Sequence, residues 1–427
     1  MHTLKEIYQD NEERNFIDPS LYSRYRVKAG LRNDNGTGVK VGLTKICDVI
    51  GYKIIHEKKY NIDGQLIYRG YPINYLVNKQ PSDKICGFEE TAYLLIFGTL
   101  PNADQLKTFK DYLLKFKMGP VDLQYETPNI LNALQIEVLK LYAKDPSADT
   151  DDLEERMMKG LKILASIPLF TFSYARNKVF KSYPYPDRSL AENILCMARG
   201  NDQYTFEEAK IMDTLLMVHA DHGGGNNSTF ANVVISSTGT DIYSCISAAI
   251  GSLKGPKHGG ANCKVTNMFK AIFHEVGFTT DKATLKKIAN RILDKDFFDH
   301  SGLIYGIGHA IYTKSDPRAL LIHEQCEALA KSKGQEEIYN CIHAFEKVAI
   351  EVMKERKGID VCANVDYYSG YVYSLLGIES DLFTPLFAIS RTAGWVSHHL
   401  ENRQSNRKLI RPANVYVGEM EEIKWQQ

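Results

Sequence analysis

The sequence predicts a mainly α-helical protein with a small β element near its start. Helical periodicity of apolar residues dominates after about residue 80, and only the part before it has strand character. Capping-box patterns, which mark helix starts, occur at Ser189-x-x-Glu192 and Thr205-x-x-Glu208. At 427 residues the chain can bury a large core, and its length suggests two or three domains.

The β element is expected within residues 39–46, 52–55 and 66–68, which are rich in β-branched and aromatic side chains. Between the last two segments, Asp63-Gly64 is typical of a tight hairpin turn, because glycine adopts the positive φ that such turns require. The sequence therefore predicts that the chain reverses at these two residues.

The helices follow from their start and stop signals. The helix that begins at Ser189 is expected to end at Gly200, and the one that begins at Thr205 is expected to run out at Gly223-Gly224-Gly225. The apolar stripe of the second helix consists of Ile211, Leu215, Leu216 and Val218. Further helices are expected over residues 280–293, 336–354 and 385–400.

Charge and composition exclude several classes of protein. Lys+Arg and Asp+Glu both number 52, so no global field attracts nucleic acid or an anionic membrane. The N-terminal residues lack the apolar core of a secretory signal, and the longest apolar stretches, such as 92–97, are too short to span a membrane. The eight cysteines form no C-x-x-C pair, which suits reduced thiols. We expect a cytoplasmic protein.

Two histidine-containing segments are candidates for chemistry. In HADHGGGN, His219 and His222 share a helix face, where imidazoles either cap the helix C-terminus or, with a carboxylate, chelate zinc. In GPKHGGAN, His258 is surrounded by small residues that let a ligand approach the backbone closely. The alternative is a turn with an incidental histidine.

Two further segments combine glycine with histidine or aspartate. A Gly306-x-Gly308-His309 turn is expected to expose successive backbone amides, which suits an anionic or amide-bearing ligand. It lacks the preceding strand and third glycine of a dinucleotide site. In NVDYYSG, Asp366 lies between apolar and aromatic neighbours. It is either a partly buried base with a raised pKa or an N-cap.

These segments, taken in order, resemble the citrate synthase family. The blocks are HADHGGGNNST, GPKHGGAN, GIGHAIYTKSDPRA, NVDYYSG, SRTAGW and RPANVYVG, and GLRNDNGTGVKVGLT and DGQLIYRGYPI are similar to the family's N-terminal β element. The likeness extends from about residue 25 to about residue 420. Each block is weakly specific, whereas the ordered set is highly specific.

The resemblance implies a role for each polar residue. Asp366 would remove a proton from the methyl group of acetyl-CoA, and His258 would donate a hydrogen bond to its thioester carbonyl. His309 would polarise the ketone of oxaloacetate, and His222 would help to hold that substrate. The two carboxylates of oxaloacetate would be bound by Arg318, Arg391 and Arg411, the last from the neighbouring subunit.

The resemblance also implies a site for CoA. The adenine pocket would be lined by the backbone of Leu303, Ile304, Tyr305, Gly306, Ile307 and Gly308. Ala310 departs from the Gly-His-Arg version of this block, which leaves the phosphate contacts open, and Lys314 is the expected substitute.

The resemblance further implies an all-α, two-domain homodimer with a shared active site. Residues 1–262 and 379–427 would form the large domain, and residues 263–378 a small domain that closes over the cleft. Acetyl-CoA and oxaloacetate are substrates, and neither a cofactor nor a metal is expected. The alternatives are a 2-methylcitrate synthase, which uses propionyl-CoA, a metal-dependent hydrolase built on the HADH segment, and a non-catalytic helical interaction protein. The last would leave the His, Asp and Arg series unexplained.

Overall fold

The computed structural model describes residues 3–10, 16–119, 127–405 and 408–418. Contacts divide the chain into two units, Met1–Gly42 with Ile410–Gln427 and Leu43–Leu409. The described elements of the first unit are the helices α1 (Leu4–Asp10) and α3 (Ser20–Arg24) and the 3-10 helix η1 (Ala29–Leu31).

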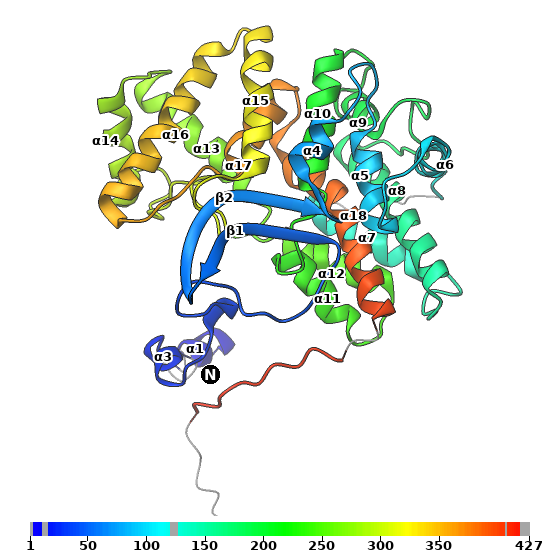
Figure 1. Ribbon diagram of the computed structural model, residues 1–427, viewed down its shortest axis with the longest axis horizontal. Coiled ribbons are helices and arrows are strands. Elements are labelled where there is room, and N and C mark those ends of the chain that lie inside the picture. Colours follow the sequence, from blue (N-terminus) through cyan, green and yellow to red (C-terminus); the bar gives the residue numbers. More distant parts are fainter. Residues whose placement is uncertain (1–2, 11–15, 120–126, 406–407, 419–427) are drawn as a thin grey trace, which may run out of the picture. The chain divides into compact units, whose positions relative to one another are not determined.

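Three antiparallel strands open the second unit. β1 (Cys47–Ile55), β2 (Lys58–Tyr68) and β3 (Tyr71–Pro72) pair in the order β1-β2-β3, and β1 and β2 form the long hairpin in Figure 1. The strands predicted over residues 52–55 and 66–68 are confirmed. The strand predicted over residues 39–46 is wrong, because the ladder with β2 begins only at Cys47, opposite Tyr68. Strand propensity produces a strand only where a partner strand is available.

The hairpin reverses at a different place from the predicted one. His56 and Glu57 form the turn with φ of 47° and 63°, whereas Asp63-Gly64 lies inside β2. A Cβ at Gly64 would lie 2.7 Å from Cδ1 of Tyr312 and would collide with the carbonyl of Ser315. The amide of Gly64 donates instead to Oγ of Ser315 at 3.1 Å. Gly64 therefore permits the loop after residue 309 to lie against β2.

Helices make up most of the second unit, which confirms the predicted all-α class with a small β element. They are α4 (Ile73–Asn78), α5 (Gly87–Phe97), α6 (Ala103–Leu114), α7 (Ile130–Ala143), α8 (Leu153–Ala175), α9 (Leu190–Arg199), α10 (Phe206–His219), α11 (Asn227–Ser236), α12 (Ile242–Leu253), α13 (Ala261–Val276), α14 (Lys282–Leu293), α15 (Pro317–Ser332), α16 (Glu336–Lys357), α17 (Val365–Leu375), η2 (Ser380–Leu382) and α18 (Phe383–Gln404). Among the described residues, no helix combines the length and the apolar composition that a membrane span requires.

Local signals place several helix ends close to where the sequence predicts them. The predicted end of α10 at Gly223-Gly224-Gly225 is wrong, because α10 ends at His219, and His222 therefore shares no helix face with His219. Both capping boxes form, and α9 ends at Gly200 with φ of 72°. The helices predicted over residues 280–293, 336–354 and 385–400 correspond to α14, α16 and α18. Helix α18 begins two residues before the predicted start, so Pro385 lies in its first turn, where proline is tolerated.

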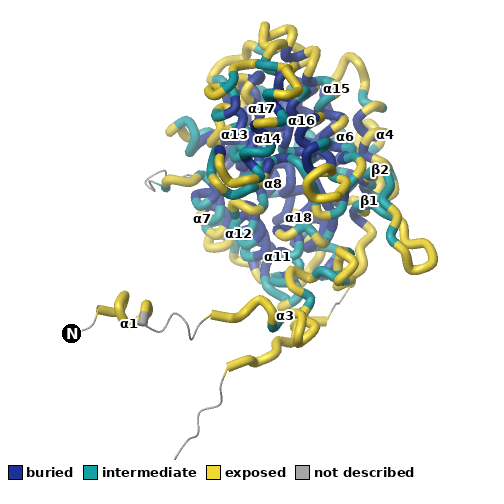
Figure 2. The backbone as a smooth tube through the Cα atoms, turned by 90° about the vertical axis from the view of Figure 1, so that its left-hand side faces the viewer, coloured by how far each residue is buried: buried dark blue, intermediate teal, exposed yellow. Residues whose placement is uncertain are grey.

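Helix α18 lies at the centre of the core. It packs against α5, α8, α10, α11 and α12, and most of its residues are buried (Figures 1 and 2). The consecutive helices α13 to α17 pack against one another (Figure 1). Helix α14 contacts α16, and both α13 and α15 contact α17. His222 follows α10, Arg318 and Asp366 lie in the first turns of α15 and α17, and Arg391 lies on α18. These helices contact one another, because α10 packs against both α15 and α18, and α15 packs against α17.

Candidate active site

His222 lies in the turn that follows α10. The C-terminus of a helix leaves carbonyl groups without intrahelical partners, and α18 supplies donors for them. Nε of Arg391 donates to the carbonyl of His219 at 2.7 Å, and the amide of Gly394 donates to that of Ala220 at 3.1 Å. His222 is buried, its ring centroid lies 5.1 Å from that of His309, and its Nε2 has no hydrogen-bond partner within the described residues.

His219 has a different environment from His222. Its Nδ1 lies 2.7 Å from the carbonyl of Leu215, and its ring lies edge-on to Phe387. Burial lowers the pKa of His219 to about 3, so it bonds to the helix as a neutral imidazole. Within the part of the chain that the structure describes, no three His, Cys, Asp or Glu side chains are grouped as metal ligands would be.

His258 lies in the turn between α12 and α13. The amide of Gly259 donates to the carbonyl of Leu253 at 2.9 Å, and a Cβ at Gly259 would lie 2.6 Å from that oxygen. This glycine therefore allows the turn to pack on α12. Burial, followed by the charge of Arg391, lowers the pKa of His258 to about 4, so the imidazole is neutral at physiological pH.

Ser228 is a site residue that the sequence reasoning missed. Its Oγ lies 3.1 Å from Nε2 of His258 and accepts a hydrogen bond from Nε1 of Trp395 at 3.2 Å. It can also donate to Oδ1 of Asn226 at 2.9 Å. When Ser228 donates to His258 instead, the imidazole carries its proton on Nδ1 and can donate from there. The separation of 30 residues between Ser228 and His258 left no local signal for this pair.

Backbone amides fix the tautomer of His309. Its Nδ1 accepts hydrogen bonds from the amides of Ile311 and Tyr312, each at 3.1 Å. An imidazole nitrogen that accepts carries no proton, so a neutral His309 has its proton on Nε2 and donates from that atom. The ring stacks on Tyr312 with the centroids 4.6 Å apart.

The glycine turn before His309 pairs with the segment that leads into α17. The amide of Gly308 donates to the carbonyl of Cys362 at 2.8 Å, and the amide of Asn364 donates to that of Gly306 at 2.8 Å. The amide of Ile307 also donates within the protein, to Ile304. The predicted run of free amides is therefore wrong for residues 307 and 308, and the pairing brings His309 close to the start of α17.

Asp366 is not the cap of α17. The cap is Asn364, whose Oδ1 accepts from the amide of Asp366 at 3.0 Å, so the alternative N-cap interpretation of Asp366 is wrong. Oδ1 of Asp366 is buried and has no hydrogen-bond partner among the described residues. Burial raises the pKa of Asp366 to about 7; the charges of Arg318 and Arg391 oppose this rise, and Asp316 adds to it. A carboxyl group in this state is a stronger base than an exposed one.

Two buried arginines on different helices act on this carboxyl group through their charge. Nε and Nη2 of Arg318 form a bidentate pair with Asp316, at 3.0 and 2.7 Å. Nη1 and Nη2 of Arg391 are buried and have no hydrogen-bond partner in the described part of the chain. Both guanidinium charges also lower the pKa of His222, after burial as the main cause. The geometry agrees, because the ring centroids of His222 and Tyr312 lie 5.6 Å apart and Arg318 lies 5.8 Å from the centroid of the same tyrosine ring. Arg391 also bonds to the end of α10 just before His222.

The remaining predicted site residues differ in their burial. Arg411 belongs to the first unit and is exposed there. Of the residues predicted to bind CoA, Leu303 and Lys314 are exposed, whereas Ile304 and Gly306 are buried. Tyr305, Ile307 and Gly308 are half-buried. Their predicted contacts with CoA stay predictions.

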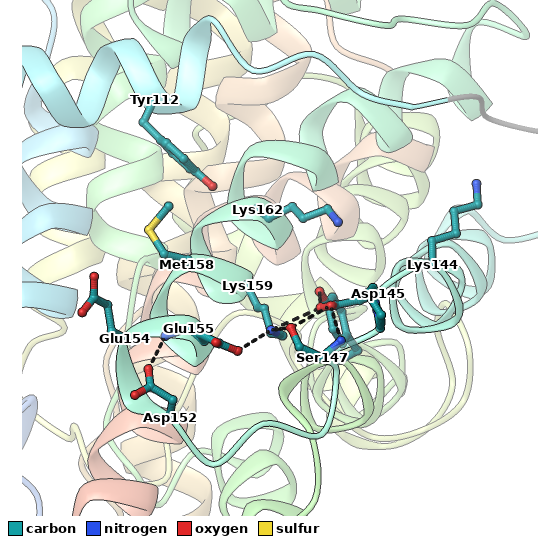
Figure 3. A pocket seen from close by; sticks show the side chains of 12 residues that line it. Tyr112, Lys144, Asp145, Ser147, Asp152, Glu154, Glu155, Met158, Lys159 and Lys162 are labelled. Atoms are coloured by element: carbon teal, nitrogen blue, oxygen red, sulfur yellow. Dashed lines mark hydrogen bonds and ion pairs between the residues drawn. The ribbon is translucent and has the colours of Figure 1, made fainter.

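A separate cavity of about 670 Å³ lies between α6, α7, α8 and α12 (Figure 3). Nζ of Lys159 lies 2.9 Å from Oγ of Ser147, 3.4 Å from Asp145 and 3.5 Å from Glu155. This ion cluster ties the loop after α7 to α8. The lining residues, Tyr112, Lys144, Asp145, Pro146, Ser147, Asp152, Glu154, Glu155, Met158, Lys159, Lys162 and Tyr243, include none of the predicted site residues.

The fold and the site define a class of protein: an all-α protein with a buried carboxyl group of raised pKa, two neutral imidazoles (His222 and His258) and two buried guanidinium groups. Such a site suits proton abstraction next to a carbonyl and the binding of a dicarboxylate. The family model "Citrate synthase, C-terminal domain" matches residues 33–413. This chain belongs to the citrate synthase family.

Two relatives and one solved structure show the range of the family. A citrate synthase of Haloferax volcanii is 37% identical over 86% of this chain and 94% of its own length. 2-Methylcitrate synthase 1 of Corynebacterium glutamicum is 33% identical over 83% of this chain and 89% of its own length. The citrate synthase of Thermoplasma acidophilum, solved in a ternary complex with carboxymethyl coenzyme A and oxaloacetate, is 26% identical. It covers 94% of this chain and 98% of its own, with a TM-score of 0.74.

Proposed function

We propose that this chain is a citrate synthase, which condenses acetyl-CoA with oxaloacetate and water to give citrate and CoA. The observation that carries the proposal is the state of Asp366, whose Oδ1 is buried without a hydrogen-bond partner among the described residues and whose pKa is raised by burial. A thioester methyl group is a weak carbon acid, so it needs both a strengthened base and a donor that stabilises the enolate.

In this proposal His258 and His309 are the electrophilic donors. His258 is neutral because its pKa is low, and when Ser228 donates its hydroxyl proton to Nε2 rather than to Asn226, the Nδ1–H of His258 donates to the thioester oxygen. His309 donates from Nε2 to the ketone oxygen of oxaloacetate, since its Nδ1 is occupied by two amides. Removing one such donor typically lowers a rate by ~100 to 1,000-fold.

The carboxylates of oxaloacetate would be held by arginine. The free Nη1 and Nη2 of Arg391 suit a bidentate contact, and Arg318 and His222 complete the pocket within one chain. Arg411 would reach the site from the partner subunit. The CoA contacts of residues 303–308 and Lys314 belong to the same proposal.

The homodimer, the two domains and the cytoplasmic location are also proposed. Helix α11 supports the dimer, because Phe230, Val233, Val234 and Ile235 leave its apolar surface only partly buried. Such a face gains stability when a second copy covers it. The small domain of residues 263–378 would close over the substrates and exclude water during condensation.

Thiol release tests the proposed reaction. With purified protein, CoA should appear from acetyl-CoA only when oxaloacetate is present, and a chelator should not abolish the activity. The same assay with propionyl-CoA tests the 2-methylcitrate alternative, which one relative of this chain represents. Because one methylene changes binding by only ~1–3 kcal/mol, activity with both is expected and their kcat/KM ratio assigns the substrate. Thiol release that is independent of oxaloacetate would contradict the proposal.

Subunit mixing tests the role of Arg411. Arg411→Ala and Asp366→Ala proteins should each be nearly inactive alone, because one lacks a substrate contact and the other lacks the base. A mixed dimer contains one site in which both residues are intact, so mixing should restore part of the activity. If mass measurements show subunit exchange and no activity returns, Arg411 does not serve the partner's site.

The pKa values of Asp366 and His258 predict how the rate depends on pH: it should fall on the acid side of the profile. Asp366 accepts a proton only when ionised, and its pKa is about 7, so kcat/KM for acetyl-CoA should fall about tenfold for each pH unit below that value. His258 should add no limb above about pH 5, since its pKa is about 4. Initial rates at saturating oxaloacetate measure this, and thermal unfolding at each pH excludes loss of fold. A profile that stays flat down to pH 5 would argue against Asp366 as the base.

A further inference from the structure

One face of α18 carries three residues that surround a buried carboxylate. Arg391, Gly394 and His398 are spaced by three and four residues, so they lie along the same side of the helix. The carboxyl group of Asp221 lies over the middle one, because a Cβ at Gly394 would be 2.7 Å from Oδ1 of Asp221 and 2.6 Å from the carbonyl of Ala220. Asp221 therefore has Arg391 about one helical turn away on one side and His398 about one turn away on the other.

Asp221 is held by its main chain and by one oxygen of its side chain. The hydroxyl of Tyr68 donates to the carbonyl of Asp221 at 2.8 Å, and Oδ2 lies 2.9 Å from Nε2 of His398. Both side chains of this pair are almost completely buried, at 0% and 2% exposure. Oδ1 has no hydrogen-bond partner within the described residues.

The buried guanidinium of Arg391 needs a negative charge nearby. Burial lowers the pKa of Arg391 to about 10, and among the charges that oppose this effect Asp221 comes first. The two groups nevertheless share no hydrogen bond: Nε of Arg391 donates to His219, while Nη1 and Nη2 have no partner within the described residues. A carboxylate in contact with those nitrogens would compete with a substrate carboxylate for the same donors.

We propose that Asp221 is the buried counter-charge of Arg391, and that His398 is a positioning residue that keeps the Asp221 carboxylate out of contact with the guanidinium, so that Nη1 and Nη2 stay available to oxaloacetate. The inference rests on the proposed function, because it concerns the binding of that substrate. Asp221 and His398 would therefore affect substrate binding indirectly, through Arg391.

His398→Leu should release the carboxylate. Without the imidazole, the buried carboxylate of Asp221 loses its charge-assisted donor, and Arg391 is the cation that acts on it most strongly after His398. The affinity for oxaloacetate should then fall about tenfold or more, which is the usual effect of a competing charge-assisted hydrogen bond. The KM for oxaloacetate should rise while kcat and the KM for acetyl-CoA stay close to those of the parent. His398→Gln retains an N–H donor and should recover much of the affinity.

The double variant distinguishes a positioning role of His398 from a role in packing alone. Asp221→Asn removes the charge that would capture Arg391, so this single variant should bind oxaloacetate at least as tightly as the parent. Asp221→Asn combined with His398→Leu should regain the affinity that His398→Leu alone loses, to within about threefold, because residues in contact give non-additive effects. If His398 served only to pack α18, the second substitution would give no recovery.

Calorimetric titration with oxaloacetate alone measures these affinities without reference to turnover. The matched control is His399→Leu, which removes the neighbouring buried imidazole whose Nε2 lies 3.3 Å from Arg156; its oxaloacetate affinity should not change. Thermal unfolding reports the stability of every variant. If the parent does not bind oxaloacetate, the proposed function fails; if it binds and the double variant stays as weak as His398→Leu, this inference fails.

Discussion

Replacing Asp366 by asparagine should lower the rate of condensation by ~100 to 10,000-fold, the usual contribution of a general base. The substitution keeps the shape of the side chain and removes its ability to accept a proton. The affinity for oxaloacetate should change little, because Arg391, Arg318 and the imidazoles carry that binding in the proposed site. Exchange of the methyl protons of acetyl-CoA with deuterated solvent should fall together with the rate.

The matched control for this variant is Asp281→Asn. Asp281 caps α14 by accepting from the amide of Thr284 at 2.8 Å, and asparagine is an equally good cap, so rate and stability should both stay near those of the parent. NMR of the methyl group and steady-state rates provide the measurements, with oxaloacetate titration as the check on binding. An Asp366→Asn protein that binds oxaloacetate and retains more than about a tenth of the parent rate would exclude Asp366 as the base.

Arg391→Leu should reduce kcat/KM for oxaloacetate by roughly 100 to 10,000-fold. In the proposed site its two buried nitrogens bind a substrate carboxylate, and a charge-assisted hydrogen bond contributes about 1.5–3 kcal/mol. Arg391→Lys should restore little of the loss, because an ammonium group lacks the planar fork that matches a carboxylate. The variant also leaves Asp221 without its buried cation, so thermal unfolding must accompany the kinetics.

Arg403→Leu is the corresponding control on the same helix. Arg403 pairs with the exposed Asp151 at 2.7 Å, and an ion pair of this kind contributes at most about 1 kcal/mol to stability. Its kcat/KM for oxaloacetate should therefore equal that of the parent. An Arg391→Leu protein that is folded and has the parent's kcat/KM would show that Arg391 does not bind the substrate.

The structure shows how few contacts bring the catalytic candidates together. The pairing of residues 306–308 with residues 362–364 joins His309 to the start of α17, and the docking of the α10 C-terminus on α18 joins His222 to Arg391. None of these contacts lies within one helix or one motif. The sequence blocks are therefore separate in the chain and continuous only in the folded protein.

The sequence by itself determined the class of fold and, to within about two residues, the starts of the five helices that it predicts. Capping boxes and terminal glycines act through hydrogen bonds between residues a few positions apart. The roles of Ser189, Thr205 and Gly200 could therefore be predicted without knowledge of any tertiary contact. The resemblance to the family could be detected in the sequence because each block is a short, contiguous segment. The β-branched and aromatic residues of segments 52–55 and 66–68 likewise predicted these two strand segments.

Only the tertiary structure decided what the glycines and the buried carboxylates do. Gly64 was predicted to turn the chain and instead makes room for Tyr312 and Ser315, which lie about 250 residues further along the chain. Asn364 rather than Asp366 caps α17, and Oδ1 of Asp366 is left buried and without a hydrogen-bond partner among the described residues. Burial, close approach and the tautomer of an imidazole depend on atoms distant in sequence, and local patterns carry no information about them.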